Sequence, residues 1–182
     1  MRRRILAPGL LAAATGAALL FGSAALAGAA SAQPPAPSAV LQGAFQMSGK
    51  VTVAANVRGE HVGQIVTRTW TFTPECSTGP CTTVRLVRGR ATGTDTLTLQ
   101  WTRAGTYAGS GAFYAPLRCT ARVYPQGEEI PFRITVRVTA VTAGAASAIS
   151  ATYVNAQRIN LTPCIGVLGH DSARYTGEPA AG

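Results

Sequence analysis

Few side chains in this 182-residue sequence could act as catalytic acids, bases or nucleophiles. His61 and His170 are the only two histidines, and Asp171 and Ser172 directly follow His170. Side chains of consecutive residues diverge, so these three residues cannot orient one another in a Ser–His–Asp relay. Most of the seven acidic residues fall in segments typical of turns, where carboxylates point into water. The sequence therefore predicts a protein that is not an enzyme, and a secreted hydrolase is the weakest alternative.

Sequence motifs for metal ions, nucleotides and other cofactors are missing as well. The sequence contains no H-x-H, no H-E-x-x-H, no P-loop and no dinucleotide fingerprint. Residues 108–112 read A-G-S-G-A, which differs from the nucleophile elbow G-x-S-x-G because alanines replace the outer glycines. No recognised nucleic-acid-binding motif occurs either. We therefore expect no cofactor, no metal ion and no nucleic-acid partner.

Arg68 is the polar residue with the clearest potential to bind a ligand. It shares its parity with Trp70 and Phe72 in an alternating segment, so it is predicted to face the interior of a sheet. A buried guanidinium must be paired, or must hold an anionic ligand. Arg68 could therefore anchor a small apolar or amphipathic ligand in a cavity lined by Trp70, Trp101 and Tyr107. The alternative is that Arg68 pairs or reaches water, and that the aromatic residues form the core.

The four cysteines predict two disulfide bonds. Cys76, Cys81, Cys119 and Cys164 are even in number, and an even number in an exported chain indicates disulfides. Of the three possible pairings we favour Cys76–Cys81, which closes a turn-rich loop, together with Cys119–Cys164. The chain-entropy model gives roughly 2 kcal/mol for the short loop and roughly 4 kcal/mol for the long one. A four-cysteine zinc site is the alternative, but the sequence has no C-x-x-C pair.

The first 32 residues have the three parts of a secretory signal. Arginines at positions 2–4 precede an apolar stretch over residues 5–26, and residues 30–32 form an A-x-A site. We predict cleavage before Gln33 and a secreted, extracytoplasmic protein of about 150 residues, the length of one domain. An uncleaved membrane anchor is the alternative. No later apolar run reaches about 18 residues, so the mature chain is expected to have no transmembrane segment.

The segments that must position these side chains alternate between apolar and polar residues, a period of two that is typical of β-strands. Residues 33–42 are predicted to be a Pro/Ala-rich spacer, residues 43–165 a β-domain, and residues 166–182 an irregular tail. Leu97, Leu99 and Trp101 alternate with polar residues in the clearest strand, residues 89–95 are expected to be a turn, and residues 125–129 carry the strongest turn signal. The sequence predicts an all-β fold: an antiparallel up-and-down barrel of about eight strands, or a two-sheet β-sandwich.

Arginine dominates the positive charge of the chain. The sequence has 16 Lys and Arg against 7 Asp and Glu, a net charge of +9, which falls to about +6 if residues 2–4 are removed. Arg118, Arg122, Arg133 and Arg137 are expected on the polar faces of adjacent strands. Such faces would attract an anionic cell-envelope polymer or lipid headgroups, and a solvated surface without a partner is the alternative.

Residues 70–81 match the pattern W-x-F-x-P-x-C-x-x-G-x-C at every position. This pattern resembles one in small exported proteins of actinobacteria, mostly of unassigned function. The resemblance implies an exported β-rich domain with disulfides, and it carries no catalytic residues. Together these features predict an exported, non-enzymatic binding or structural protein of the cell envelope or exterior. A barrel carrier of a small apolar or amphipathic ligand is the alternative.

Overall fold

A computed structural model of the chain describes residues 37–91, 93–165 and 168–181. The predicted signal sequence, its cleavage site and the first part of the predicted spacer lie outside these residues. Among the described residues, no helix has the length and apolar character needed to span a bilayer.

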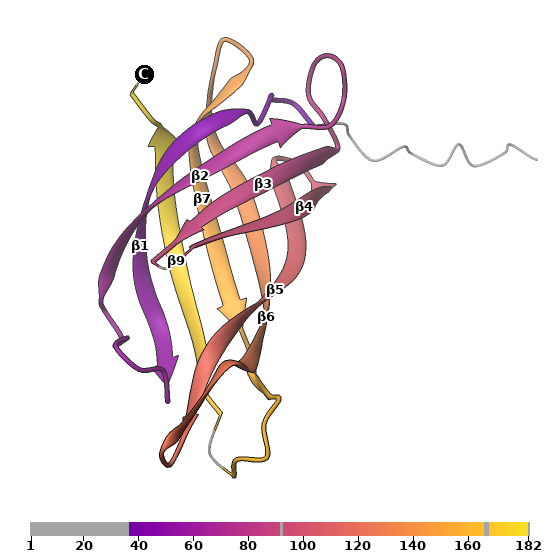
Figure 1. Cartoon of the computed structure of the whole chain (residues 1–182). Helices are drawn as coiled ribbons and strands as arrows, with labels where there is room; N and C mark the ends of the chain where they lie inside the picture. The colour runs from indigo at the N-terminus through magenta and orange to yellow at the C-terminus, as the bar shows by residue number, and fades with distance from the viewer. Residues whose placement is uncertain (1–36, 92, 166–167, 182) are drawn as a thin grey trace, which may run out of the picture. The chain divides into compact units, whose positions relative to one another are not determined.

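The described part of the chain forms a closed antiparallel β-barrel (Figure 1). Its strands are β1 (Gly43–Ala55), β2 (Ile65–Pro74), β3 (Thr83–Arg90), β4 (Gly93–Arg103), β5 (Thr106–Cys119), β6 (Arg122–Thr142), β7 (Ala145–Asn155), β8 (Ile159–Asn160) and β9 (His170–Pro179). Strands β1 to β7 pair in chain order, β7 pairs with β9, and β9 pairs with β1 to close the barrel. The short strand β8 pairs only with β6. The predicted up-and-down barrel is therefore confirmed, and the two-sheet sandwich does not form.

The apolar core fills the half of the barrel where β1 begins and β2 ends, which we call the closed end. Phe45, Trp70 and Phe72 are fully buried there, and the rings of Phe45 and Phe72 meet edge to face at 5.5 Å. Leu41, which precedes β1, is also buried, and its neighbour Val40 exchanges backbone hydrogen bonds with Gly144 and Ala146. The last residues of the predicted spacer are therefore packed into this end of the barrel.

The prediction of an irregular C-terminal tail over residues 166–182 is wrong. Residues 170–179 form β9, which lies between β1 and β7, where an irregular tail was expected. The inward face of β9 is built from Ala173, Tyr175 and Gly177, so its hydrophobic pattern is weak. A Cβ at Gly177 would collide with the sulfur of Met47, so a larger residue there would force the buried Met47 side chain to move.

The expected turns at 125–129 and 89–95 are also wrong. The long hairpin of β5 and β6 reverses at Thr120, which has a positive φ of 51°. Residues 125–127 instead lie in a register irregularity opposite Pro116, where a proline can be tolerated inside a strand. Strand β3 likewise continues to Arg90, and strand β4 begins at Gly93. The turn between them is therefore much shorter than the expected one.

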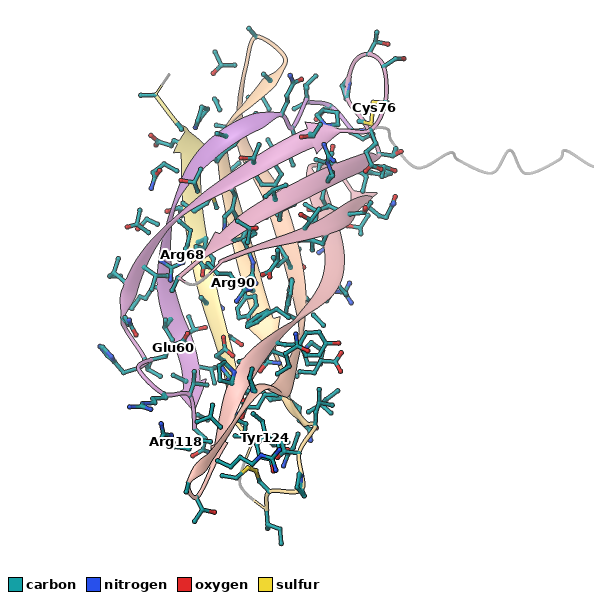
Figure 2. All side chains as sticks on the ribbon, viewed as in Figure 1. Glu60, Arg68, Cys76, Arg90, Arg118 and Tyr124 are labelled. Atoms are coloured by element: carbon teal, nitrogen blue, oxygen red, sulfur yellow. A yellow bond between two sulfur atoms is a disulfide. The ribbon has the colours of Figure 1, made fainter. Side chains whose placement is uncertain are left out.

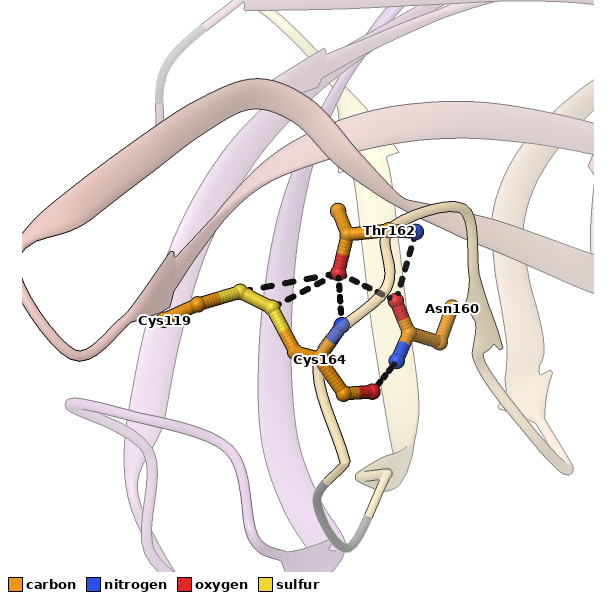
Figure 3. The surroundings of a disulfide bond; sticks show 4 residues. All are labelled: Cys119, Asn160, Thr162 and Cys164. Carbon is orange, nitrogen blue, oxygen red and sulfur yellow. Dashed lines mark hydrogen bonds between the residues drawn. A yellow bond between two sulfur atoms is a disulfide. The ribbon is translucent and has the colours of Figure 1, made fainter.

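Both predicted disulfides are present, Cys76–Cys81 and Cys119–Cys164, each with a Cα–Cα distance of 5.8 Å. The zinc alternative is therefore wrong, and the disulfides indicate an oxidising environment. Cys119–Cys164 joins the tip of the β5–β6 hairpin to the connection between β7 and β9. Figure 3 shows that Asn160 braces this connection: it accepts hydrogen bonds from the amide and hydroxyl of Thr162, both at 2.8 Å, and donates to the Cys164 carbonyl at 2.7 Å.

Candidate functional site

The half of the barrel away from the closed end contains a cavity of about 530 Å³. We call this half, where β1 ends and β9 begins, the open end. Seven of the strands contribute to the cavity wall, together with the loop between β1 and β2 that carries Glu60. Figure 2 shows Arg68 and Arg90 at the middle of the barrel, Glu60 below them, and Arg118 near the tip of the β5–β6 hairpin. The wall mixes charged groups with apolar side chains such as Val66, Phe113 and Ile130.

The cavity acquires its charged wall because the inward positions of β3 and β4 change from apolar to charged, while the alternation itself continues. On β3 the inward series runs from Val84 and Leu86 to Arg88. On β4 the inward series runs in the opposite direction along the chain, from Leu99 and Leu97 back to Asp95. The apolar residues of both strands therefore lie toward the closed end and the charged ones toward the open end.

Arg88, Arg90 and Asp95 form the first charged cluster. Arg88 donates to the Asp95 carboxylate through Nε at 3.2 Å and through Nη2, while Arg90 Nε lies 2.7 Å from Asp95 Oδ1. The Arg88 guanidinium lies 4.4 Å from the ring centroid of Phe132 and 4.7 Å from that of Tyr153. The side chains of Arg88 and Asp95 are each only 6% exposed. One carboxylate thus serves two arginines, which leaves this wall positively charged.

Arg158, Glu128 and Asp171 form the second cluster, closer to the mouth. Arg158 donates to Glu128 Oε2 at 3.0 Å and to Asp171 Oδ1 at 3.4 Å, so it links β6 to β9. Burial, and next the negative charge of Asp171, raise the pKa of the Tyr153 phenol well above its ordinary value. Burial and the charge of Asp171 also raise the pKa of Glu60. Two carboxylates share one arginine here, so this cluster has an excess of negative charge, whereas the first cluster has an excess of positive charge.

Arg68 lines the cavity without a carboxylate partner. Its Nη1 donates to the Thr67 carbonyl at 2.8 Å, and none of the four ion pairs in the described part of the chain includes it. Trp70 pairs with Arg88 in the β2–β3 register, and Arg68 and Arg90 each lie two residues beyond that pair and line the same cavity. The guanidinium of Arg68 therefore adds to this wall a positive charge that is held in no ion pair of the described chain, although it partly offsets the rise that burial causes in the pKa of the Glu60 carboxyl across the cavity.

Of the predicted ligand-binding residues, the structure brings only Arg68 to the cavity. Among the described residues, the cavity wall includes none of Trp70, Trp101 and Tyr107. Trp70 and Tyr107 are fully buried in the core, and the Tyr107 hydroxyl donates to the Cys81 carbonyl at 2.9 Å. Trp101 packs against the same core at the closed end. These aromatic residues form the core, as the alternative interpretation had it.

The charged clusters were not predicted from the sequence, although their residues share parity with apolar neighbours, which is the signal that identified Arg68. Arg88 shares its parity with Leu86, Asp95 with Leu97, and Asp171 with Ala173. The expected turn at 89–95 and the expected tail concealed these inward positions. The histidines take no part in the clusters: His61 lies in an exposed loop and His170 is exposed at the start of β9.

The chain matches no protein-family model, no curated protein and no solved structure. The resemblance of residues 70–81 to exported actinobacterial proteins therefore stays a prediction.

Proposed function

We propose that this protein is an exported, non-enzymatic binding protein whose barrel takes up a small amphipathic ligand through its open end. The observation that carries the proposal is the cavity of about 530 Å³ in which Arg68 has no carboxylate partner. Barrels of eight strands are just wide enough to hold one small ligand, and ligand pockets typically measure about 300–1,000 Å³.

The wall chemistry supports an anionic group on that ligand. Arg68 and Arg90 line the same cavity, and Asp95 neutralises only part of the charge of the three arginines on this wall. A guanidinium fork suits carboxylate and phosphate groups, because both offer two oxygens in its plane. The apolar part of the ligand would contact Val66, Phe113 and Ile130, which line the same cavity.

Export is supported by the two disulfides and by the signal-like first 32 residues. Binding rather than hydrolysis is supported by the positions of His61 and His170, which are both exposed and contribute no side chain to the cavity wall in the described part of the chain.

The test compares dodecyl phosphate, inorganic phosphate and dodecanol as probes in isothermal titration calorimetry. We expect saturable binding of dodecyl phosphate, weaker binding of dodecanol, and little binding of inorganic phosphate. Arg68→Gln should weaken dodecyl phosphate binding about 10- to 100-fold, because hydrogen bonds to charged groups contribute about 1.5–3 kcal/mol. The affinity for dodecanol should stay within about threefold, since the apolar wall is unchanged.

Arg85→Gln is the matched control, because Arg85 is an exposed arginine on the outer face of β3. It should leave binding of all three probes unchanged. The proposal is wrong if wild-type protein binds no amphiphile, or if Arg68→Gln and Arg85→Gln weaken dodecyl phosphate equally.

A further inference from the structure

The outer wall of the barrel carries a cluster of positive charges that is separate from the cavity. We call it the basic face, and it consists of Lys50, Arg103, Arg133, Arg137 and Arg174. All five side chains are exposed, and none takes part in the four ion pairs of the described chain. The basic face lies on the outer side of the strands, whereas Arg68, Arg88, Arg90 and Arg158 belong to the barrel interior.

The strand register explains why these residues lie together. Arg174 on β9 lies directly opposite Lys50 on β1. Arg137 lies two strands and two residues from Arg174, which corresponds to about 12 Å between Cα atoms. Arg133 is four residues from Arg137 on β6, or about 13 Å. Guanidinium groups at these spacings can contact successive anionic groups of one extended chain.

The positions between these cations carry hydroxyl groups rather than carboxylates. Arg103 pairs with Thr106, which pairs with Arg137, and the cross-strand row continues through Ser150 and Thr176. The neighbouring row that ends in Arg174 and Lys50 contains Thr135 and Thr152. None of these positions in the described barrel is acidic, so no protein carboxylate competes for a bound anion there.

A surface groove of about 430 Å³ lies in this face. It is flanked by Arg103 and Arg137 and lined by the hydroxyl-bearing residues Thr106, Thr135, Ser150 and Thr152. Arginine and hydroxyl donors together can saturate the several oxygens of a phosphate group, which accepts more hydrogen bonds than a carboxylate does.

From this arrangement we infer that the basic face binds a linear polymer with phosphate groups in its main chain. The groove holds one phosphate between Arg103 and Arg137, and Arg133, Arg174 and Lys50 contact the phosphates that follow along the polymer. The interaction is electrostatic and lies outside the barrel, so it is independent of the proposed ligand cavity.

The experiment measures binding of long-chain inorganic polyphosphate to the full-length protein over a salt series. The triple variant Arg133→Gln/Arg137→Gln/Arg174→Gln should bind about 100-fold more weakly at low salt, since each basic residue near an anionic surface contributes about 1 kcal/mol. The slope of log K against log salt should also become shallower by about one for each arginine removed.

The matched control removes the same charge elsewhere, with Arg85→Gln/Arg118→Gln/Arg122→Gln on β3 and the hairpin tip. It should retain affinity within about threefold, and Arg68→Gln should not change polyphosphate binding at all. If the triple variant is poorly folded, the Arg→Lys triple at 133, 137 and 174 keeps the charge and should keep most of the binding.

Three results would overturn the inference. An equal loss in both triple variants would mean that total charge, and not this face, governs binding. Equal binding of polyglutamate and polyphosphate would remove the assignment to phosphate. Absence of polyphosphate binding to the wild-type protein at low salt would remove the site itself.

Discussion

The substitution Asp95→Asn tests the charged interior most directly. Among the residues that the structure describes, Asp95 is the only carboxylate within ion-pair distance of Arg88 and Arg90, and its side chain is 6% exposed. The asparagine has nearly the same shape, so the substitution removes charge without leaving a cavity. It leaves the Arg88 guanidinium buried beside Arg90, with only neutral groups as partners.

The magnitude follows from the burial of the pair. Breaking a buried ion pair by removing one partner costs about 3–5 kcal/mol, because the remaining charge stays desolvated and unpaired. A domain is stable by only about 5–15 kcal/mol, so the substitution should remove about a fifth of the total or more. With an m-value near 2 kcal/mol/M, the urea midpoint should fall by about 2 M.

The assay is urea unfolding followed by tryptophan fluorescence, with both disulfides intact. The triple variant Arg88→Met/Arg90→Met/Asp95→Leu removes all three charges of the cluster and should stay within about 1.5 kcal/mol of the wild type, because buried ion pairs and triads contribute little net stability. Glu178→Gln, an exposed change on β9, should shift stability by less than about 0.5 kcal/mol. A loss below about 1 kcal/mol for Asp95→Asn, or a triple variant as unstable as the single one, would refute this reasoning.

Two further predictions concern stability. Replacing both cysteines of Cys119–Cys164 by serine should cost about 4 kcal/mol, against about 2 kcal/mol for Cys76–Cys81, because their sequence separations are 45 and 5; equal losses in urea unfolding would contradict the loop-entropy argument. Burial raises the pKa of Tyr153 and of Tyr175 above the ordinary value of 10.0, so the folded state holds these protons more tightly than the unfolded state. Stability is then intact below pH 10 and should fall above it by up to about 1.4 kcal/mol per pH unit for each tyrosine; ionisation of all five tyrosines with a common midpoint near pH 10 in folded protein, read from ultraviolet absorbance, would contradict this.

Alternation in the sequence was sufficient to predict an all-β antiparallel fold, because half-buried strands repeat every two residues, but it left the barrel and the two-sheet sandwich both open. Leu97 and Leu99 illustrate this, since both face the core as expected. The strand β9 escaped prediction because its inward residues are alanine, tyrosine and glycine, which carry little hydrophobic signal. Its place in the sheet depends on partners far away in the sequence, Met47 among them, which no local pattern contains.

The candidate site was predicted only at Arg68, which lies inside a clearly alternating segment. Asp95 follows the same parity rule but was assigned to the expected turn at 89–95, and Arg88 was placed directly before that turn. Gly89 and Gly93, which suggested the turn, lie within β3 and at the start of β4. The partner of each charge also lies on another strand, so pairing could not be predicted. An arginine without a carboxylate can be recognised only once the register is known.

The charged half of the barrel interior favours ligand binding over a purely structural role. An eight-stranded barrel can fill its interior with apolar side chains, as the closed end does here. Replacing buried ion pairs by apolar residues of similar size is often neutral or stabilising, so stability alone does not call for Arg88, Asp95 and their neighbours. The triple variant Arg88→Met/Arg90→Met/Asp95→Leu separates the two roles, because it should keep the fold while removing one net positive charge from the wall beside Arg68. If dodecyl phosphate binds that variant as tightly as it binds the wild type, the charged cluster contributes nothing to binding, and the positive wall is not what recognises the ligand.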